Sequence, residues 1–229
     1  MAKLRAIIVS VLLLLAVAPD NAAVARTPLP ALETNAQTLA NIVLPHDQFL
    51  AIRVPRFDAA YAEELEEDAR LIALQKTNPG ITNAIKAAAH HEAEKSYGAA
   101  LTLLQNDVAR LYASKFTALE LGTLITFFRS ETGQAMIIMS AGASGDTASE
   151  FEASRRAKAI AMIQNPSDTT KRDLTTLMQS GLLPKVRAIN PEISALSERR
   201  FDDVRNIVEA ALPARVEATI KAFTEKPKS

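Results

Sequence analysis

The sequence predicts an all-α protein, a bundle of about seven to nine helices after a cleaved signal peptide. The composition favours helices, because Ala, Leu, Glu and Lys are abundant while the chain has no Trp, three Tyr and seven Gly. Runs of β-branched and aromatic residues, which strands prefer, are missing. Apolar residues instead recur at intervals of three and four along most of the chain. Because the chain has no Cys, we expect a hydrophobic core rather than disulfides to hold the helices together.

The first 25 residues have the three parts of a secretory signal peptide. Lys3 and Arg5 form a basic start, residues 6–18 are apolar, and residues 23–25 read Ala-Val-Ala. The apolar run is shorter than the roughly 20 residues that a helix needs to cross a bilayer. We therefore expect cleavage before Arg26, a periplasmic or secreted location, and no transmembrane segment in the mature chain. An uncleaved membrane anchor is the alternative.

Charge and composition argue against several classes of ligand. Without residues 1–25 the chain loses Lys3, Arg5 and Asp20, so its 26 basic and 26 acidic residues become 24 and 25. This balance argues against nucleic acid as a partner, because phosphate recognition needs a surplus of Lys and Arg. The absence of Cys removes thiolate metal sites and thiol nucleophiles. We expect no metal, no cofactor and no nucleic acid.

The mature chain is predicted to begin with a leader and a short helix (26–48). Two prolines keep residues 26–32 extended, and a helix over residues 33–43 is stopped by Pro45. A helical domain (49–165) follows. In it, Pro55 is placed as a first-turn proline of a helix that reaches residue 76 and ends at Asn78-Pro79-Gly80. The state of residues 46–54 stays open.

A long helix is predicted over residues 81–114, with a kink at Gly98 where the apolar stripe changes phase. The next helix begins with a capping box, in which the Thr117 hydroxyl and the Glu120 carboxylate each accept from the other residue's amide. Phe116 and Leu121 are placed for a hydrophobic staple. The predicted buried face is formed by Leu121, Leu124, Ile125 and Phe128.

Residues 140–145 are predicted to form a loop, residues 147–164 a helix, and residues 165–168 a turn. In the C-terminal helical region (166–229), Thr170 to Asp173 resembles a second capped helix start. It is either a decayed repeat of the Thr117 helix or an ordinary amphipathic helix. Asn190-Pro191 is predicted to open a helix that Pro213 interrupts, and residues 225–229 are predicted to fray.

The segment that begins at Phe116 and ends at Met136 resembles a known family. The shared pattern is a Thr-capped helix that ends in two aromatic residues, followed by Ser, Gly and Gln at fixed spacing. Its residues are Thr117, Glu120, Leu121, Leu124, Ile125, Phe127, Phe128, Ser130, Gly133 and Gln134. This run resembles the bacterial envelope family called domain of unknown function 2059, in which a Pro usually stands where this chain has Glu131. Pro and Glu both suit the first residue of a helix.

The resemblance extends loosely over residues 51–164. It implies a helical, signal-bearing protein of the Gram-negative periplasm. The family has no assigned activity, so the resemblance implies no catalytic residue. We nominate Phe127, Phe128, Arg129 and Ser130 as a ligand or partner site, because the pattern centres on them and Arg129 offers a fork for a carboxylate or phosphate. The alternative is a structural role, in which the aromatic pair belongs to the core and the residues after it cap the helix end.

Three other clusters are weaker candidates. His90, His91 and Glu94 supply too few ligands at the wrong spacing for a zinc site, and a solvated helix face explains them better. The acidic residues 63–68 would splay outward on a straight helix, which does not suit calcium, although Glu66 and Arg70 have the spacing of an ion pair. Residues 142–145 lack the flanking residues of a phosphate loop or nucleophile elbow.

The leading hypothesis is therefore a non-enzymatic module of the bacterial envelope that binds another envelope protein or an amphiphilic ligand in an interhelical groove. The alternative is a periplasmic hydrolase or lyase that uses carboxylates or His90 and His91. Self-association through a helix face is a third hypothesis. No residue is nominated as catalytic or as a metal ligand.

Overall fold

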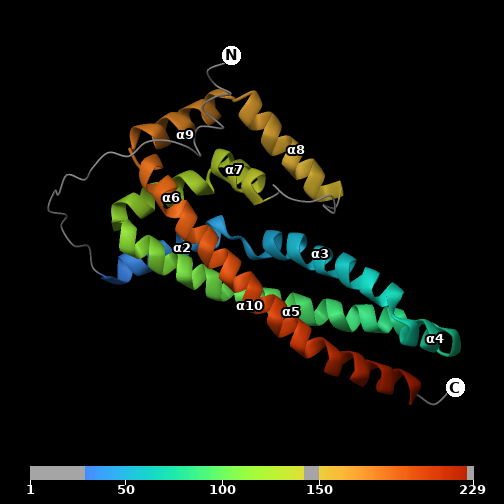
Figure 1. The fold of residues 1–229 in the computed structure, drawn as a ribbon. Helices are drawn as coiled ribbons and strands as arrows, with labels where there is room; N and C mark the ends of the chain where they lie inside the picture. The colour runs from blue at the N-terminus through green and yellow to red at the C-terminus, as the bar shows by residue number, and fades with distance from the viewer. Residues whose placement is uncertain (1–28, 142–149, 226–229) are drawn as a thin grey trace. The chain divides into compact units, whose positions relative to one another are not determined.

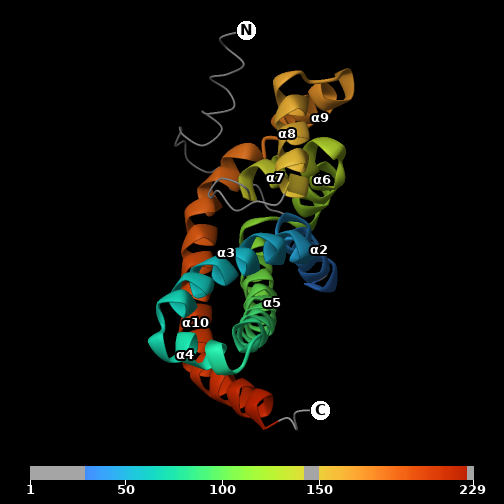
Figure 2. The ribbon, with the colours of Figure 1, turned by 90° about the vertical axis from the view of Figure 1, so that its right-hand side faces the viewer.

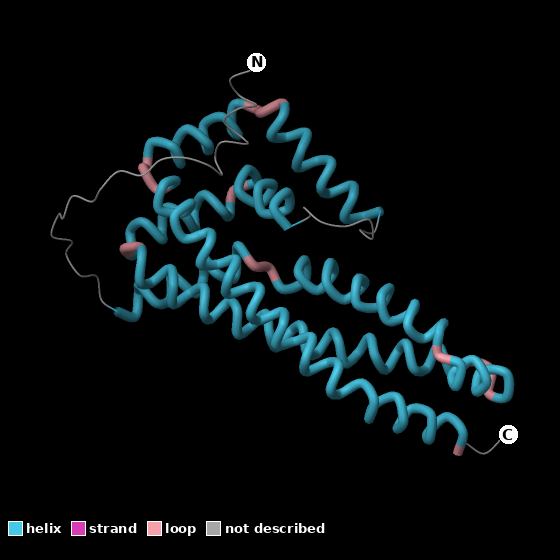
Figure 3. Tube along the Cα trace, in the orientation of Figure 1, coloured by secondary structure: helices cyan, strands magenta, loops and turns pink. Residues whose placement is uncertain are grey.

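The computed structural model describes residues 29–141 and 150–225. These residues form nine helices and no strand, so the all-α prediction is confirmed for the described part of the chain (Figure 3). In chain order the helices are α2 (Leu29–Val43), α3 (His46–Glu67), α4 (Ala69–Thr77), α5 (Ile81–Lys115), α6 (Ala118–Arg129), α7 (Glu131–Ala141), α8 (Glu150–Gln164), α9 (Asp168–Gln179) and α10 (Leu183–Thr224). Among these helices, none has an apolar stretch long enough to span a membrane.

The chain divides into two compact units, each built from separate stretches of sequence. Unit 1 holds α2, α6, α7, α8 and α9, together with residues 105–115 of α5 and 183–197 of α10. Unit 2 holds α3 and α4, together with residues 81–104 of α5 and 198–224 of α10. The boundaries suggested by the sequence at residues 48 and 165 stay predictions.

In unit 1, α6 packs against α2, α7 and α9, and α7 packs against α8 and α9 (Figure 1). The amide of Asn35 on α2 donates to the Ala118 carbonyl at the start of α6, 3.2 Å away. The fully buried Thr132 on α7 donates to the Asp173 carboxylate on α9 at 2.8 Å. The apolar side chains buried in this unit include Leu39, Val108, Tyr112, Phe116, Leu121, Leu124, Ala135, Ile137, Ile163, Leu177 and Ile189.

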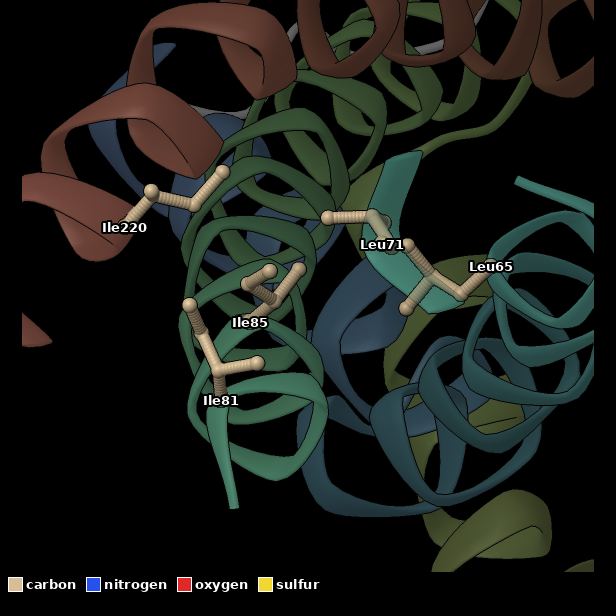
Figure 4. Close-up of a cluster of buried hydrophobic side chains, with 5 residues drawn as sticks. All are labelled: Leu65, Leu71, Ile81, Ile85 and Ile220. Carbon is tan, nitrogen blue, oxygen red and sulfur yellow. The ribbon is translucent and has the colours of Figure 1, made fainter. Parts of the chain in front are cut away.

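In unit 2, the first half of α5 runs antiparallel to the second half of α10, and α3 and α4 pack beside them (Figure 2). Near the start of α5 the core consists of Leu65, Leu71, Ile81, Ile85 and Ile220 (Figure 4). A second cluster consists of Ala100, Val204 and Val208, with Phe57, Tyr97 and Leu212 packed against it. Burial of these apolar side chains stabilises the unit.

Prolines interrupt fewer helices than the sequence suggested. Pro55 lies inside α3, and α10 continues through both Pro191 and Pro213, so the helix starts predicted at Pro55 and at Asn190-Pro191 are wrong. Each proline removes one backbone hydrogen bond, but packing of the neighbouring turns keeps the helix intact. At Pro55 this packing includes the preceding residue, Val54, which is buried.

The single helix predicted over residues 55–76 is interrupted at Asp68, which separates α3 from α4. The Asp68 carboxylate accepts from the amides of Arg70 at 2.8 Å and Leu71 at 3.2 Å, which caps α4. The predicted pair between Glu66 and Arg70 is therefore wrong. Arg70 forms a bidentate pair with Glu217, and Glu66 lies 3.8 Å from Lys86.

Other boundaries are confirmed or shifted by a few residues. α5 ends one residue beyond the predicted helix and passes through Gly98 without a break. α2 starts at Leu29, four residues earlier than predicted, with Pro30 in its first turn. α8 ends where predicted. The loop predicted at 140–145 is wrong for residues 140 and 141, which belong to α7, and its other residues lie outside the described residues, as do residues 147–149, the predicted signal peptide and residues 226–229.

The predicted start of α9 at Thr170 is wrong. Ser167 caps this helix, and its hydroxyl accepts from the Thr170 amide at 3.1 Å. Thr170 is therefore the third residue of the helix and is buried. Since Thr117 is a cap and Thr170 is not, the alignment that suggested an internal repeat pairs residues with different roles.

Candidate functional site

The family-like run begins at the cap of α6, which forms as predicted. The Glu120 amide donates to the Thr117 hydroxyl at 3.2 Å, and the Thr117 amide donates to the Glu120 carboxylate at 2.8 Å. The Lys185 ammonium on α10 donates to the other Glu120 oxygen. Burial by itself would raise the pKa of Glu120, but the hydrogen bonds from Lys185 and Thr117 outweigh it and lower that pKa. The cap thus also ties α10 to α6.

The end of the run forms a tight turn from α6 into α7, which we call the α6–α7 corner (residues 127–134). Ser130 caps α7 by accepting from the Gly133 amide at 3.2 Å. The Gln134 side-chain amide donates to the Phe128 carbonyl at 2.6 Å, which satisfies a backbone group at the end of α6. A Cβ on Gly133 would lie 2.2 Å from the Phe127 oxygen, so only glycine allows this approach. Ser130, Gly133 and Gln134 therefore build the corner.

The four nominated residues of this corner lie in different environments. Phe127 is buried and Phe128 half-buried, with their rings edge to face at 5.2 Å. Phe127 therefore takes the buried position that was predicted for Phe128. Arg129 is exposed, and no residue in the described ranges pairs with it. Their role as a ligand or partner site stays a prediction, now centred on Arg129.

The histidine cluster is exposed on α5. His90 lies 2.7 Å from the Asp58 carboxylate on α3, and these two residues line a 270 Å³ cavity with Tyr61, Lys86 and Ala87. His91 faces a different cavity, so the structure does not bring the two histidines together. Within residues 29–141 and 150–225, no three His, Cys, Asp or Glu side chains gather as a metal site would require.

A larger cavity of 430 Å³ lies between α5 and α10 in unit 2, and we call it the α5/α10 groove. Its size is within the range of small-molecule sites, about 300–1,000 Å³. Most of its lining side chains are small or apolar. The lining consists of Ala84, Ala88 and His91 from α5 and Arg215, Ala218, Thr219, Ala222 and Phe223 from α10.

The polar groups of the groove lie at one end. The Arg215 Nε donates to the Glu92 carboxylate at 3.0 Å, and the Glu92 side chain is only 9% exposed. Arg215 itself is 52% exposed, and no described residue accepts from its two terminal nitrogens. The Thr219 hydroxyl donates to the Arg215 carbonyl at 2.8 Å. This end therefore presents His91 and the edge of the Arg215 guanidinium for which the described residues offer no acceptor.

Sequence reasoning missed this groove. Glu92 and Arg215 are 123 residues apart, and no sequence pattern connects them. A weaker signal was present, because Ala84, Ala88 and His91 share a face of α5, as Arg215, Ala218 and Ala222 share a face of α10. Small residues on two such faces are compatible with a groove but do not show that the faces meet.

Comparison with known proteins gives a match that includes the family-like run. No curated protein and no solved structure matches the chain significantly. Residues 104–152 match a family described as an uncharacterized protein conserved in bacteria (DUF2059), which confirms the resemblance over that segment. The stretch from the end of α5 into α8 is therefore similar to this family.

Proposed function

We propose that this chain is an exported, non-enzymatic binding module of the bacterial envelope, and that it holds an apolar or amphiphilic ligand in the α5/α10 groove. The signal-like residues 1–25 support export. The match to a family conserved in bacteria is consistent with a bacterial envelope protein.

The observation that carries the proposal is the division of the groove into an apolar end and a polar end. Ala84, Ala222 and Phe223 lie at one end, and His91 and Arg215 lie at the other. Binding sites for small ligands combine an apolar lining with a few polar groups that fix orientation. The polar lining residues are His91, Arg215 and Thr219, and the Thr219 hydroxyl is committed to its own helix. This set suits binding better than catalysis.

Binding is tested with the neutral apolar dye N-phenyl-1-naphthylamine, whose fluorescence rises in apolar surroundings. We expect the purified chain to bind the dye and Ala88→Leu, which fills the middle of the groove, to lose that binding. Ala99→Leu is the matched control, because Ala99 is exposed on the same helix outside the groove. Equal dye binding by both variants would remove the groove from the proposal.

Export is tested by expressing the whole chain in a Gram-negative host and determining the N-terminus of the product by mass spectrometry. The proposal predicts a periplasmic product that begins at Arg26. A product that keeps residues 1–25 and stays with the cytoplasm would contradict export, while one that keeps them in the membrane fraction would indicate an uncleaved anchor.

A hydrolase or lyase is the second candidate, and one observation favours it. Asp58 lies 2.7 Å from His90 and could orient it as a general base, with Tyr61 and Lys86 lining the same cavity. Under this hypothesis, His90→Gln would abolish turnover of an ester or glycoside panel and His46→Gln would not. Absence of turnover by the unmodified chain across the panel would leave binding as the better account.

Self-association and an envelope protein partner remain proposals of the same kind. Light scattering tests the first, because a monomer at high micromolar concentration would exclude it. The second is tested by capture of an envelope protein with Arg129→Ala.

A further inference from the structure

From the polar end of the α5/α10 groove we infer that its ligand is a single-chain amphiphile with a carboxylate head group, bound with the head at Arg215 and His91 and the chain toward Phe223. This inference rests on the proposed binding function, and it adds the chemical class and orientation of the ligand. Four features of the groove support it: the geometry of Arg215, the position of His91, the length of the apolar part, and the volume.

The position of Arg215 determines the head group. Glu92 holds the Nε edge of the guanidinium at 3.0 Å, so the side chain is fixed by a nearly buried carboxylate. The two terminal nitrogens have no partner among the described residues, and they form the other edge of the planar fork. Such an edge matches the two oxygens of a carboxylate. Because Glu92 already balances the charge of Arg215, the attraction depends on these hydrogen bonds more than on surplus charge.

His91 reinforces this preference from the other helix. It lines the groove on α5, opposite Arg215 on α10. Its ring has no partner among the residues that the structure describes. A ring N–H can donate to the same carboxylate in either protonation state. A cationic ammonium head group has no acceptor atom for these donors.

The apolar part of the groove sets the length of the chain. Ala84 and His91 are seven positions apart on α5, which corresponds to about 10 Å along the helix. Ala88 lies between them, and Ala218 and Ala222 line the opposite wall. The side chain of Phe223 lines the far end. An extended chain of medium length therefore fits between the head-group position and Phe223.

The volume favours a small molecule over a partner helix. An α-helix with its side chains is about 10–12 Å across, and a stable protein interface buries more than about 1,000 Å². A 430 Å³ groove lined largely by alanines accepts one slender chain instead. We therefore commit to a free amphiphile and treat a membrane surface or a partner helix as alternatives for the test.

The test measures displacement of the naphthylamine dye from the full chain by three ligands with the same ten-carbon tail. Decanoate is expected to compete about tenfold better than decanol or decyltrimethylammonium, since charge-assisted hydrogen bonds are worth that factor or more. Arg215→Gln should remove this preference while keeping dye binding. Arg205→Gln is the matched control. Arg205 lies on α10 like Arg215 and is paired with a glutamate, Glu209, but it does not line the groove.

Arg215→Gln leaves the buried Glu92 without its cation, so the double variant Glu92→Gln/Arg215→Gln is measured beside it, with folding checked by circular dichroism. Loss of the decanoate preference in the double variant supports the inference, and a retained preference overturns it.

The remaining outcomes separate this inference from the proposed function. If all three ligands compete equally and Ala88→Leu blocks them all, the groove binds ligands but the head-group assignment is wrong. If no ligand displaces the dye and Ala88→Leu has no effect on dye binding, the proposed function fails as well. Binding of anionic lipid vesicles without binding of decanoate would replace the free amphiphile by a membrane surface.

Discussion

The α6–α7 corner and the α5/α10 groove are opposites in sequence and in geometry. The corner carries the residues by which the chain resembles a family, and its side chains Ser130 and Gln134 bond to the backbone of Gly133 and Phe128. The groove carries no pattern that sequence reasoning could single out, yet it has a 430 Å³ cavity and an arginine whose terminal nitrogens have no partner among the described residues. The family-like pattern therefore forms a turn of the backbone here, while the proposed ligand site lies between residues without a shared motif.

The largest effect is expected at Gly133. A Cβ there would lie 2.2 Å from the Phe127 oxygen and 2.5 Å from the Phe128 Cα, so the backbone of the corner would have to open. Gly133→Ala should lower the free energy of unfolding by about 3 kcal/mol or more, measured by urea denaturation. Gly122→Ala is the control on α6, where a Cβ meets nothing within 4 Å. This variant should be neutral or stabilising by up to about 1 kcal/mol. Similar losses in both variants would contradict the close packing of the corner.

The cap of α6 should give the next effect. Thr117→Ala removes the hydroxyl that accepts from the Glu120 amide and should cost about 1 kcal/mol of stability. Thr123→Ala is the comparison, since Thr123 lies inside the same helix and donates only to the Leu119 carbonyl. It should be close to neutral in the same urea measurement. If Thr123→Ala costs as much as Thr117→Ala, the capping box is not what stabilises the start of α6.

The pH dependence of stability should reveal how much the ionised Glu120 carboxylate stabilises the folded chain. Its pKa is lowered in the folded chain, because the hydrogen bonds from Lys185 and Thr117 outweigh burial, so the folded state binds its proton less readily than the unfolded state does. This stabilisation is present above the unfolded pKa of about 4.3 and is lost as the pH falls toward the folded value. Glu120→Gln keeps the side chain that a capping box accepts but cannot ionise. The stability difference between the two proteins should shrink from pH 7 to pH 3, and a constant difference would refute the assignment.

The smallest effect on stability is expected at Arg129. Its exposed side chain has no partner among the described residues, so Arg129→Ala should change the free energy of unfolding by less than about 0.5 kcal/mol. Ser130→Ala, one residue further, should cost about 1 kcal/mol because Ser130 caps α7. An envelope protein captured by the chain and by Arg110→Ala but lost with Arg129→Ala would make the corner a partner site. Capture by both variants would leave the corner with its structural role.

Sequence reasoning predicted the features that neighbouring residues determine. The capping box at Thr117 and the ends of α5 depend on residues within one turn. The capping box is correct, and the ends of α5 are correct to within one residue. It failed where contacts between residues far apart in the sequence determine where a helix continues or ends. Pro55 is held inside α3 by packing around Val54, and the break at Asp68 is followed at once by the pair between Arg70 and Glu217, 147 residues apart.

The candidate site was predictable to a similar degree. Sequence reasoning found the residues of the corner, because their pattern is local. It did not find the groove, because Glu92 and Arg215 meet only through the antiparallel packing of α5 and α10. It also treated His90 and His91 as one cluster, although they face different cavities.

The central claim is that ligand binds in the groove and that the corner is structural. Spectra of the chain with ¹³C-labelled alanine methyl groups test it directly during titration with decanoate. We predict shifts for Ala84, Ala88, Ala218 and Ala222, which line the groove, and none for Ala135, which is buried beside the corner. Shifts at Ala135 with unchanged groove methyl signals would contradict the claim.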